Sequence, residues 1–236
     1  MPTENLNKKE KYIQFLFNQV AERYDLFNRI ASLSLDSRWR KKAIVHLQPE
    51  NGDRFLDIGT GTGELALKLA KRINGGEVVG IDFCDKMLDI ARRKKEEKSC
   101  KKNIRFILAK AEDLPFPDNY FDGIITGFVM RHLKMEEALK EIIRVLRPNG
   151  HLVILEIGKP ESIWFRKLYY FYLRRILPLI GMTLVGTKEP FCVLASSVIG
   201  FLEAEELKSV LQKMGLRKIR NFVLNKGIVS LYVGVK

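Results

Sequence analysis

The sequence predicts an α/β fold: a Rossmann-like sheet of seven strands, mostly parallel, that ends in an antiparallel hairpin. A short apolar run before three closely spaced glycines, between Phe55 and Gly63, is typical of a strand that turns into a helix. Strand-like and helix-like segments then alternate from Arg54 onward, which indicates a parallel sheet with helices on both faces. Two final β-like segments meet at Lys226-Gly227 with no helix between them, which indicates a hairpin.

The periodicity of apolar residues places each element. Strands are expected at 54–59, 77–83, 104–109, 121–128 and 150–157, followed by the hairpin strands 217–224 and 228–235. Helices are expected at 63–73, 85–97, 134–146 and 203–214. Gly215 after the last helix is a C-cap signal.

Two segments lie outside this alternation. Residues 8–47 look helical, with an apolar face at Tyr12, Phe15, Leu16, Val20 and Tyr24, so we expect residues 1–47 to form an N-terminal helical cap on the main α/β domain, 48–236.

Residues 159–199 are expected to form a lid-like insertion in that domain. Its stretch 163–177 is basic and rich in aromatic residues, as in interfacial helices, and Pro178 is expected to end the helix. The segment could face a membrane, line a substrate pocket, or simply pack on the core.

The glycine turn indicates the kind of ligand. Its pattern, Asp57-x-Gly59-x-Gly61-x-Gly63, differs from the dinucleotide fingerprint, and the acidic Glu64 stands where that fingerprint has glycine. A carboxylate there would repel a pyrophosphate, and Asp57 is expected to point into the same pocket. Two acids therefore favour a cationic, phosphate-free ligand such as S-adenosylmethionine.

Two later strand ends add to this site. The second strand ends at Asp82-Phe83, where a carboxylate can accept hydrogen bonds from both ribose hydroxyls. The turn after the third strand carries Ala111 and Glu112, which could bind the adenine amine; a plain acidic loop is the alternative.

The composition limits the number of domains and the general class of protein that this chain can be. The chain has 236 residues, 46% of them hydrophobic, which suffices for one sizeable α/β domain with a cap or insertion. Its first ten residues lack the apolar core of a signal peptide, and no uninterrupted apolar run is long enough to span a membrane. Cys84, Cys100 and Cys192 are odd in number and lack metal-type spacing, so a reduced, cytoplasmic protein with packing cysteines is expected.

The chain is strongly basic, with a net charge of +13 from 41 basic and 28 acidic residues. Such an excess attracts nucleic acid or an anionic membrane surface, although a solvated surface with nothing bound is the alternative.

With these residues in place, the chain resembles the class I S-adenosylmethionine-dependent methyltransferases, and within them the ubiquinone/menaquinone biosynthesis C-methyltransferases. The general cofactor pattern covers about 54–158. Four more specific segments carry the narrower resemblance: Val20-Ala21-x-x-Tyr24-Asp25-x-x-Asn28 with Trp39; Ala111-Glu112-x-Leu114-Pro115-Phe116; Leu155-Glu156-Ile157-Gly158-Lys159-Pro160 with Leu177-Pro178-Leu179-Ile180-Gly181; and 227–236.

The chain departs from the family pattern at several positions. The family usually has Asn or Asp at Lys110, Asn at His132 and His at Tyr232. Its tyrosine-rich segment is replaced by 190–198, and its Gly-x-His-Arg by 35–38. Several of these positions are expected to face the acceptor pocket.

The resemblance implies methyl transfer from S-adenosylmethionine to a ring carbon of a demethylated polyprenyl quinol, in a reaction that needs no metal. Arg131, which matches the family's arginine, is expected to orient the acceptor or stabilise its phenolate. His132 has a suitable ordinary pKa for proton transfer, with surface solvation as the alternative. Tyr24 is a candidate for closing over the methionine end. The candidate cofactor-binding residues are Asp57, Gly59, Thr60, Gly61, Gly63, Asp82, Phe83, Ala111, Glu112 and Gly127.

The expected partners are the polyprenyl quinol and, through weak electrostatic contact, the inner face of the cytoplasmic membrane. No nucleic-acid-binding module is visible, and a homodimer is left open. Three alternatives stay open: a methyltransferase of another lipid or small molecule, an RNA methyltransferase, and a cofactor-binding protein without catalysis.

Overall fold

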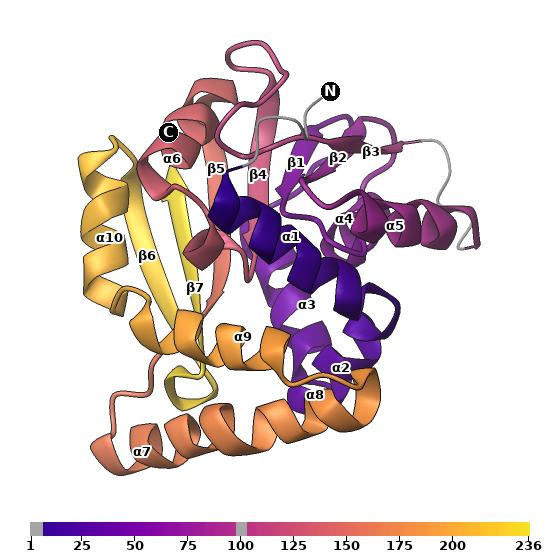
Figure 1. Ribbon diagram of the computed structural model, residues 1–236. Coiled ribbons are helices and arrows are strands. Elements are labelled where there is room, and N and C mark those ends of the chain that lie inside the picture. The colour runs from indigo at the N-terminus through magenta and orange to yellow at the C-terminus, as the bar shows by residue number, and fades with distance from the viewer. Residues whose placement is uncertain (1–6, 98–102) are drawn as a thin grey trace.

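The computed structural model describes residues 7–97 and 103–236, and its strands form one sheet in the order β3-β2-β1-β4-β5-β7-β6 (Figure 1). Strands β1 to β5 are mutually parallel, and β7 runs antiparallel to both β5 and β6. The strands are β1 Arg54–Ile58, β2 Glu77–Asp82, β3 Ile104–Leu108, β4 Phe121–Gly127, β5 Leu146–Ile157, β6 Arg217–Leu224 and β7 Val229–Val235. The predicted fold class is confirmed.

The helices also follow the predicted order. The cap region holds α1 Lys8–Val20, α2 Tyr24–Ala31 and α3 Leu35–Leu47; the alternating part holds α4 Glu64–Ala70, α5 Asp85–Glu97 and α6 Met135–Val145; the insertion holds α7 Ile163–Phe171, α8 Leu177–Val185 and α9 Glu189–Gly200; and α10 Ala204–Lys213 precedes the hairpin. The division at residue 47 stays a prediction, and α3 contributes Ala43 and Leu47 to the apolar core of the sheet.

The strand order reverses next to β1, since β2 pairs with one edge of β1 and β4 with the other. The connections that leave the carboxyl ends of β1 and β4 therefore diverge, which opens a crevice where ligands bind in open α/β sheets. The glycine turn after β1 lies at this point.

Three apolar clusters build the core. Alternate residues of the strands face opposite sides, so Leu56 packs toward α6 and α10 whereas Phe55 packs toward α3 and α4. A third cluster joins the first two cap helices to α5 and the insertion through residues such as Phe27, Met87 and Phe191. The cap and the insertion therefore share one apolar interior above the carboxyl edge of the sheet.

Three details differ from the expectations. Strand β5 begins at Leu146, before Pro148, because Leu146 already pairs with Phe121 and the register shifts before it resumes at His151. Pro178 does not end a helix. A π turn at Tyr172–Ile176 joins α7 directly to α8, and Pro178 lies in the first turn of α8, where a missing N–H is tolerated.

The predicted apolar face of α1 is only half buried. Leu16 and Val20 are in the core, whereas Tyr12 and Phe15 are exposed. Tyr12 donates a hydrogen bond to Glu189 at the start of α9, so its hydroxyl ties the cap to the insertion.

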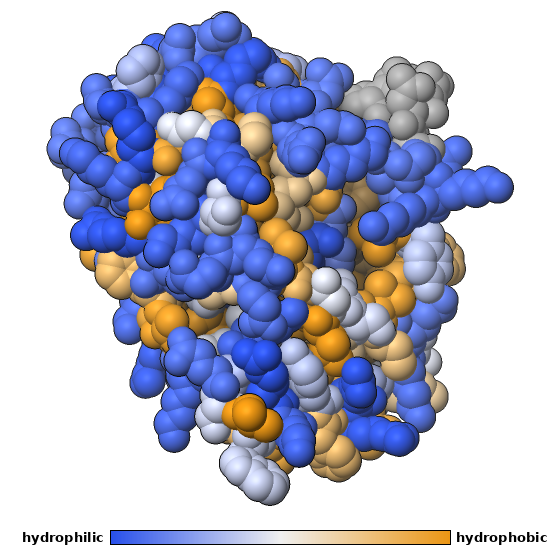
Figure 2. All heavy atoms as spheres, turned by 90° about the vertical axis from the view of Figure 1, so that its left-hand side faces the viewer, coloured by the Kyte–Doolittle hydropathy of each residue, from blue (hydrophilic) through white to orange (hydrophobic). Residues whose placement is uncertain are grey.

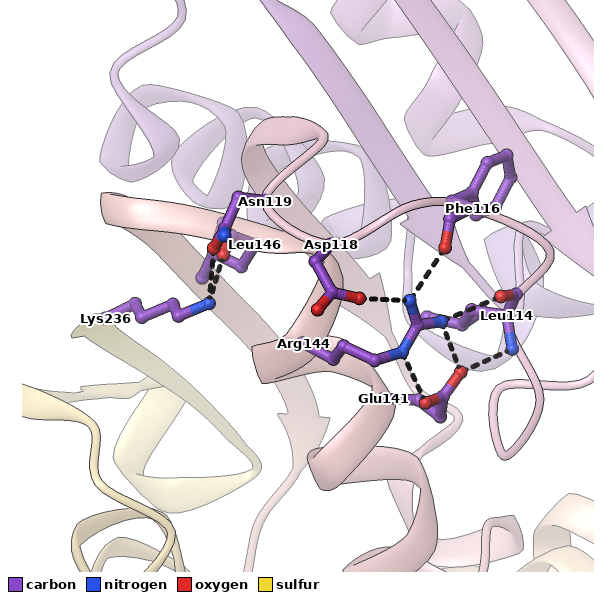
Figure 3. Close-up of polar contacts among 8 residues, drawn as sticks. All are labelled: Leu114, Phe116, Asp118, Asn119, Glu141, Arg144, Leu146 and Lys236. Atoms are coloured by element: carbon purple, nitrogen blue, oxygen red, sulfur yellow. Dashed lines mark hydrogen bonds and ion pairs between the residues drawn. The ribbon is translucent and has the colours of Figure 1, made fainter.

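The loop between β3 and β4 is held by one arginine of α6 (Figure 3). Arg144 donates to the carbonyl oxygens of Leu114 and Phe116 at 2.9 and 2.8 Å, and it pairs with Glu141 and Asp118. Glu141 in turn accepts a hydrogen bond from the backbone N–H of Leu114 at 2.8 Å. This network fixes the loop that carries the predicted adenine-side residues.

Replacing Arg144 with alanine is expected to lower the free energy of unfolding by about 2 kcal/mol, because two carbonyl groups and two carboxylates lose a charged partner. Chemical denaturation measures this change. The matched control is Arg92→Ala on α5, whose partners Asp85 and Asp89 are exposed carboxylates, so a loss below about 1 kcal/mol is expected. Equal losses in the two variants would contradict the role given to the Arg144 network.

Candidate active site

The turn after β1 requires its glycines. Gly59 has φ +64°, and a Cβ there would lie 2.6 Å from Cγ2 of Val129. Gly63 has φ +80°, and a Cβ there would lie 3.0 Å from both Ala91 and Phe106. Gly61 also has a positive φ, but the space beside it is open. The turn therefore packs tightly at both ends and is accessible in the middle.

Asp57 holds the turn from beneath. Its Oδ2 accepts hydrogen bonds from Thr60 Oγ1 at 2.7 Å and from the N–H of Ala66 at 3.1 Å. The side chain is fully buried, and this burial raises its pKa to about 7. Its Oδ1 is buried without a partner. Asp57 therefore organises the turn and does not border either cavity, and its expected contact with a ligand stays a prediction.

Asp82 holds the same turn from the side. Its Oδ2 accepts from the N–H of Gly61 at 2.8 Å, and its Oδ1 accepts from the N–H of Cys84 at 2.9 Å. Burial raises the pKa of Asp82 to about 6. Unlike Asp57, Asp82 borders a cavity, so its carboxylate can meet a ligand.

A first cavity, here called the cofactor-side cavity, lies at the ends of β1, β2 and β3. It brings together five of the ten predicted cofactor residues: Gly59, Asp82, Phe83, Ala111 and Glu112. The other five do not border it: Asp57, Thr60, Gly61, Gly63 and Gly127. Thr60, Gly61 and Gly63 shape the turn through the contacts above, and a Cβ at Gly127 would lie 2.7 Å from Leu65.

Glu64 does not act on this cavity as expected. It pairs with Lys94 at 2.9 Å and with Lys68 at 3.0 Å. Burial would raise its pKa, but the two lysines hold it at about 2. Its charge is therefore compensated within the protein, and the ligand-facing acids of the cavity are Asp82 and Glu112, together with Glu10 from the cap.

These residues fit an adenosine-type ligand. The accessible Gly61, the buried carboxylate at the end of β2 and the acidic turn after β3 follow one another along the sheet edge. The unpartnered Oδ1 of Asp57 below the turn also suits a cationic group nearby. Among the residues that the structure describes, no group of three His, Cys, Asp or Glu side chains could hold a metal ion.

Helix α1 covers the cofactor-side cavity. Glu10 reaches across it to Lys110 at 2.8 Å and to Lys134 at 3.3 Å, and Gln14 Nε2 donates to the carbonyl of Phe83 at 2.8 Å. Burial opposes ionisation of Glu10, but the hydrogen bond from Lys110 and other favourable contacts lower its pKa overall. These contacts could not be predicted from sequence patterns, because the partners lie at least 69 residues apart along the chain.

Asp25 joins α2 to the glycine turn. Its Oδ1 accepts from Thr62 Oγ1 at 2.6 Å, and its Oδ2 pairs with Lys94 of α5 at 2.5 Å. Asp25 appeared in the N-terminal motif, but its role was not predicted. This contact fixes the cap to the same turn that the two buried aspartates hold.

A second cavity, here called the apolar cavity, lies between the cap and the insertion and has a volume of about 150 Å³. It shares two lining residues, Ile13 and His132, with the cofactor-side cavity. Its lining is mainly aromatic and aliphatic and includes Tyr24, Phe27, Trp39, Phe128, Ile157, Tyr169, Tyr172, Leu173, Leu177 and Phe191. The two cavities therefore meet at His132, where a donor and an acceptor could come together.

Arg131 lies at the wall of the apolar cavity. Its Nη1 pairs with Glu156 at 2.5 Å and donates to the carbonyl of Phe128 at 2.6 Å, and its Nε donates to Ser197 Oγ at 3.2 Å. Both members of the ion pair are almost fully buried. Sequence reasoning named Arg131 but missed Glu156 as its partner, and it missed Arg40, another buried arginine that borders the cavity.

His132 differs from both expectations. Burial, reinforced by the charge of Arg131, lowers its pKa to about 2, so it is neither a solvated surface residue nor an imidazole with ordinary basicity. Its Nε2 is buried without a partner, and its ring packs edge-on against Phe17 with centroids 5.8 Å apart. Tyr24 also packs edge-on against Phe17 and borders the apolar cavity, so both candidates meet the same ring.

The departures from the family pattern divide into two groups. His132 and the segment Pro190-Phe191-x-Val193-Leu194 line the apolar cavity, as expected. Tyr232 is buried in the core of the sheet and does not border either cavity. Of the cysteines, Cys84 is buried and Cys192 is exposed, and Cys100 lies outside the described residues.

The chain is similar to members of one methyltransferase family over nearly its whole length. The model of the ubiE/COQ5 methyltransferase family matches residues 5–236. A demethylmenaquinone methyltransferase from Thermus thermophilus is 40% identical over 220 residues, which cover 93% of this chain and 99% of the relative. A ubiquinone/menaquinone biosynthesis C-methyltransferase UbiE from Geotalea daltonii is 35% identical over 98% of this chain and 99% of its own length.

Among solved structures, a SAM-dependent methyltransferase from Thermotoga maritima superposes with a TM-score of 0.66, covering 95% of this chain and 99% of its own at 20% identity, which shows the shared fold. The full-length family match and the identities above 30% show more than the fold. The chain belongs to the ubiE/COQ5 methyltransferase family and is an S-adenosylmethionine-dependent methyltransferase.

Proposed function

We propose that this enzyme transfers a methyl group from S-adenosylmethionine to a ring carbon of a demethylated polyprenyl quinol in respiratory quinone biosynthesis. The activities for which the two relatives are named support this substrate class. The structural observation that supports it best is the apolar cavity, which is lined by aromatic rings, shares His132 with the cofactor-side cavity and is bordered by a buried arginine.

The cofactor supplies the methyl group as an electrophile, and the protein positions the two reactants. Asp82, Ala111 and Glu112 line the cofactor-side cavity, where Asp82 would accept hydrogen bonds from the ribose hydroxyls and the other two would border the adenine. The space beside Gly61 lets the backbone approach closely. Tyr24 borders the apolar cavity on the cap side and closes over the methionine end.

The acceptor ring lies in the apolar cavity beside Arg131. Loss of a proton from a ring hydroxyl makes the neighbouring carbon nucleophilic, and a guanidinium stabilises the oxyanion that forms. Glu156 holds that guanidinium in place. Because the pKa of His132 is about 2, His132 stays neutral and serves as a hydrogen-bonding partner of the ring oxygen rather than as a cation.

The acceptor's tail resides in a bilayer, so the enzyme meets it at a membrane surface. The net charge of +13 favours an anionic surface such as the inner face of the cytoplasmic membrane. Within 7–97 and 103–236, the structure has no helix both long and apolar enough to cross a bilayer. A homodimer stays a prediction.

A turnover assay with methyl-labelled S-adenosylmethionine tests the reaction. Reduced demethylmenaquinol, demethoxy-type benzoquinols and total RNA are offered separately, and each product is identified by mass spectrometry. We expect label on a ring carbon of one quinol. Label on an oxygen, on RNA or on none of the acceptors would contradict the proposal.

Loss of Arg131 is expected to affect turnover and not cofactor binding. Because Arg131→Ala leaves Glu156 buried without its partner, the sharper variant is the double change Arg131→Gln with Glu156→Gln, which removes both charges together. We expect kcat to fall about 100-fold, with the Kd for S-adenosylhomocysteine within about twofold of wild type. A folded double variant with wild-type kcat would exclude Arg131 from the reaction.

Cofactor binding should weaken at acid pH. Ribose hydroxyls donate to the ionised carboxylate of Asp82, whose pKa is about 6 without ligand, so binding favours the ionised form. The affinity for S-adenosylhomocysteine should be constant well above pH 6 and fall about tenfold per pH unit below it.

Isothermal titration calorimetry measures this dependence, with Asp82→Asn as the control. That variant should bind more weakly and without the step near pH 6. A step that persists in Asp82→Asn would assign the titration to another group, such as Asp57.

A further inference from the structure

The insertion presents a long helical surface that the protein itself leaves uncovered. α7, the π turn and α8 form one continuous rod from Ile163 to Val185, which runs along the bottom of Figure 1. One face of the rod is buried at four-residue intervals through Tyr169, Leu173, Leu177 and Gly181. Gly181 allows close packing, since a Cβ there would lie 1.9 Å from Phe191 of α9.

The opposite face of the rod exposes large apolar side chains on both sides of the π turn, with the exposed Arg175 between the two groups. The exposed fractions are Trp164 81%, Leu168 63%, Phe171 56%, Leu179 54% and Met182 46%. Figure 2 views the molecule from the side of α10; at its lower end, where the rod begins, hydrophobic and pale spheres lie among hydrophilic ones. A stripe of this length is more than the scattered apolar residues of an ordinary surface.

The charges along the rod have one sign. No acidic residue occurs between Glu161 and Glu189, whereas this stretch holds five basic residues: Arg166, Lys167, Arg174, Arg175 and Lys188. Arg166 is bound to Glu203 and to the carbonyl of Pro160. Lys167, Arg174 and Arg175 are exposed. An apolar stripe between exposed basic residues is the pattern of a helix that lies in a lipid interface.

We propose that the exposed face of the rod, 163–185, docks on an anionic lipid bilayer, with its apolar stripe among the acyl chains and its basic residues at the headgroups. The inference rests on the proposed quinol acceptor for its purpose, because the buried face of the rod contributes Tyr169, Tyr172 and Leu173 to the apolar cavity. The same rod thus lies on the membrane and forms a wall of the acceptor site. A polyprenyl tail can stay in the bilayer while its ring enters the protein.

Trp164 has the geometry of an interfacial anchor. The ammonium group of Lys167 lies over the Trp164 ring, 5.2 Å from its centre, so an exposed indole and a positive charge stand together at the start of the rod. Tryptophan and lysine prefer this arrangement at a boundary between water and an apolar phase.

A second copy of the chain suits this face less well than lipid does. Self-association of two rods would bring Lys167, Arg174 and Arg175 of one copy near the same residues of the other, with no acid on the exposed face to offset them. Anionic phospholipid headgroups neutralise the positive charges of these residues directly.

Vesicle binding tests the proposal. Vesicles of phosphatidylcholine with and without phosphatidylglycerol are floated with wild type, with Trp164→Ser/Leu168→Ser and with Arg174→Gln/Arg175→Gln. We expect the apolar double variant to lose binding to anionic vesicles about tenfold or more. The arginine double variant should lose about tenfold on anionic vesicles and little on neutral ones.

Two controls on α3 match these variants: Val45→Ser, at 58% exposure, and Lys41→Gln/Lys42→Gln, both exposed. Both controls should bind like wild type. If rod and control variants lost binding equally, or if neither lost any, the docking face would be wrong. Rod variants that only turn a dimer into a monomer in light scattering would identify the face as an interface between copies.

Kinetics separate this inference from the proposed function. With a water-soluble, tail-less demethylated quinol, the rod variants should keep wild-type kcat/KM, whereas with a long-tailed quinol in anionic vesicles their kcat/KM should fall in step with vesicle binding. If the wild-type enzyme methylates neither quinol while the rod variants still lose vesicle binding, the docking face would stand and the proposed function would be overturned. Unchanged kcat/KM of the rod variants on the long-tailed quinol would overturn the role of the rod in acceptor entry.

Discussion

Two buried carboxylates at the ends of neighbouring parallel strands hold the glycine turn, and the rest of the site depends on this arrangement. Asp57 fixes the turn to the start of α4 through Ala66, and Asp82 fixes it to the end of β2 through Gly61. Burying two acids this close is unfavourable, as their raised pKa values show. Backbone N–H groups and Thr60 offset that cost only when the turn has this conformation, so the acids and the glycines require one another.

The N-terminal cap is attached to the same glycine turn. Asp25 binds Thr62 in the middle of the turn and Lys94 on α5, while Glu10 bridges two lysines across the cofactor-side cavity. The cap also forms one side of the apolar cavity, and the insertion forms the other. The acceptor site and the proposed lipid-facing rod therefore share a single apolar cluster with the cap rather than being built as separate modules.

Local chemistry could be predicted from the sequence, and long-range pairing could not. The strands, the glycine turn and Asp82 followed from periodicity and turn residues that lie within a few positions of one another. Pro178 was wrongly expected to end a helix, because the π turn before it depends on the packing of the following helix, α8, against α9. The low pKa of His132 and the direction of Asp57 depend on burial, which a pattern does not report. The pairing of Arg131 with Glu156 joins two strand ends 25 residues apart and was equally hidden.

We propose that donor and acceptor meet where the two cavities share His132 and Ile13. A crystal structure with S-adenosylhomocysteine and an oxidised, demethylated quinone would test this meeting point. We expect ribose hydroxyls on Asp82, the quinone ring in the apolar cavity beside Arg131, and the thioether sulfur facing a ring carbon at His132. A ring bound outside that cavity, or a nucleoside away from Asp82, would contradict it.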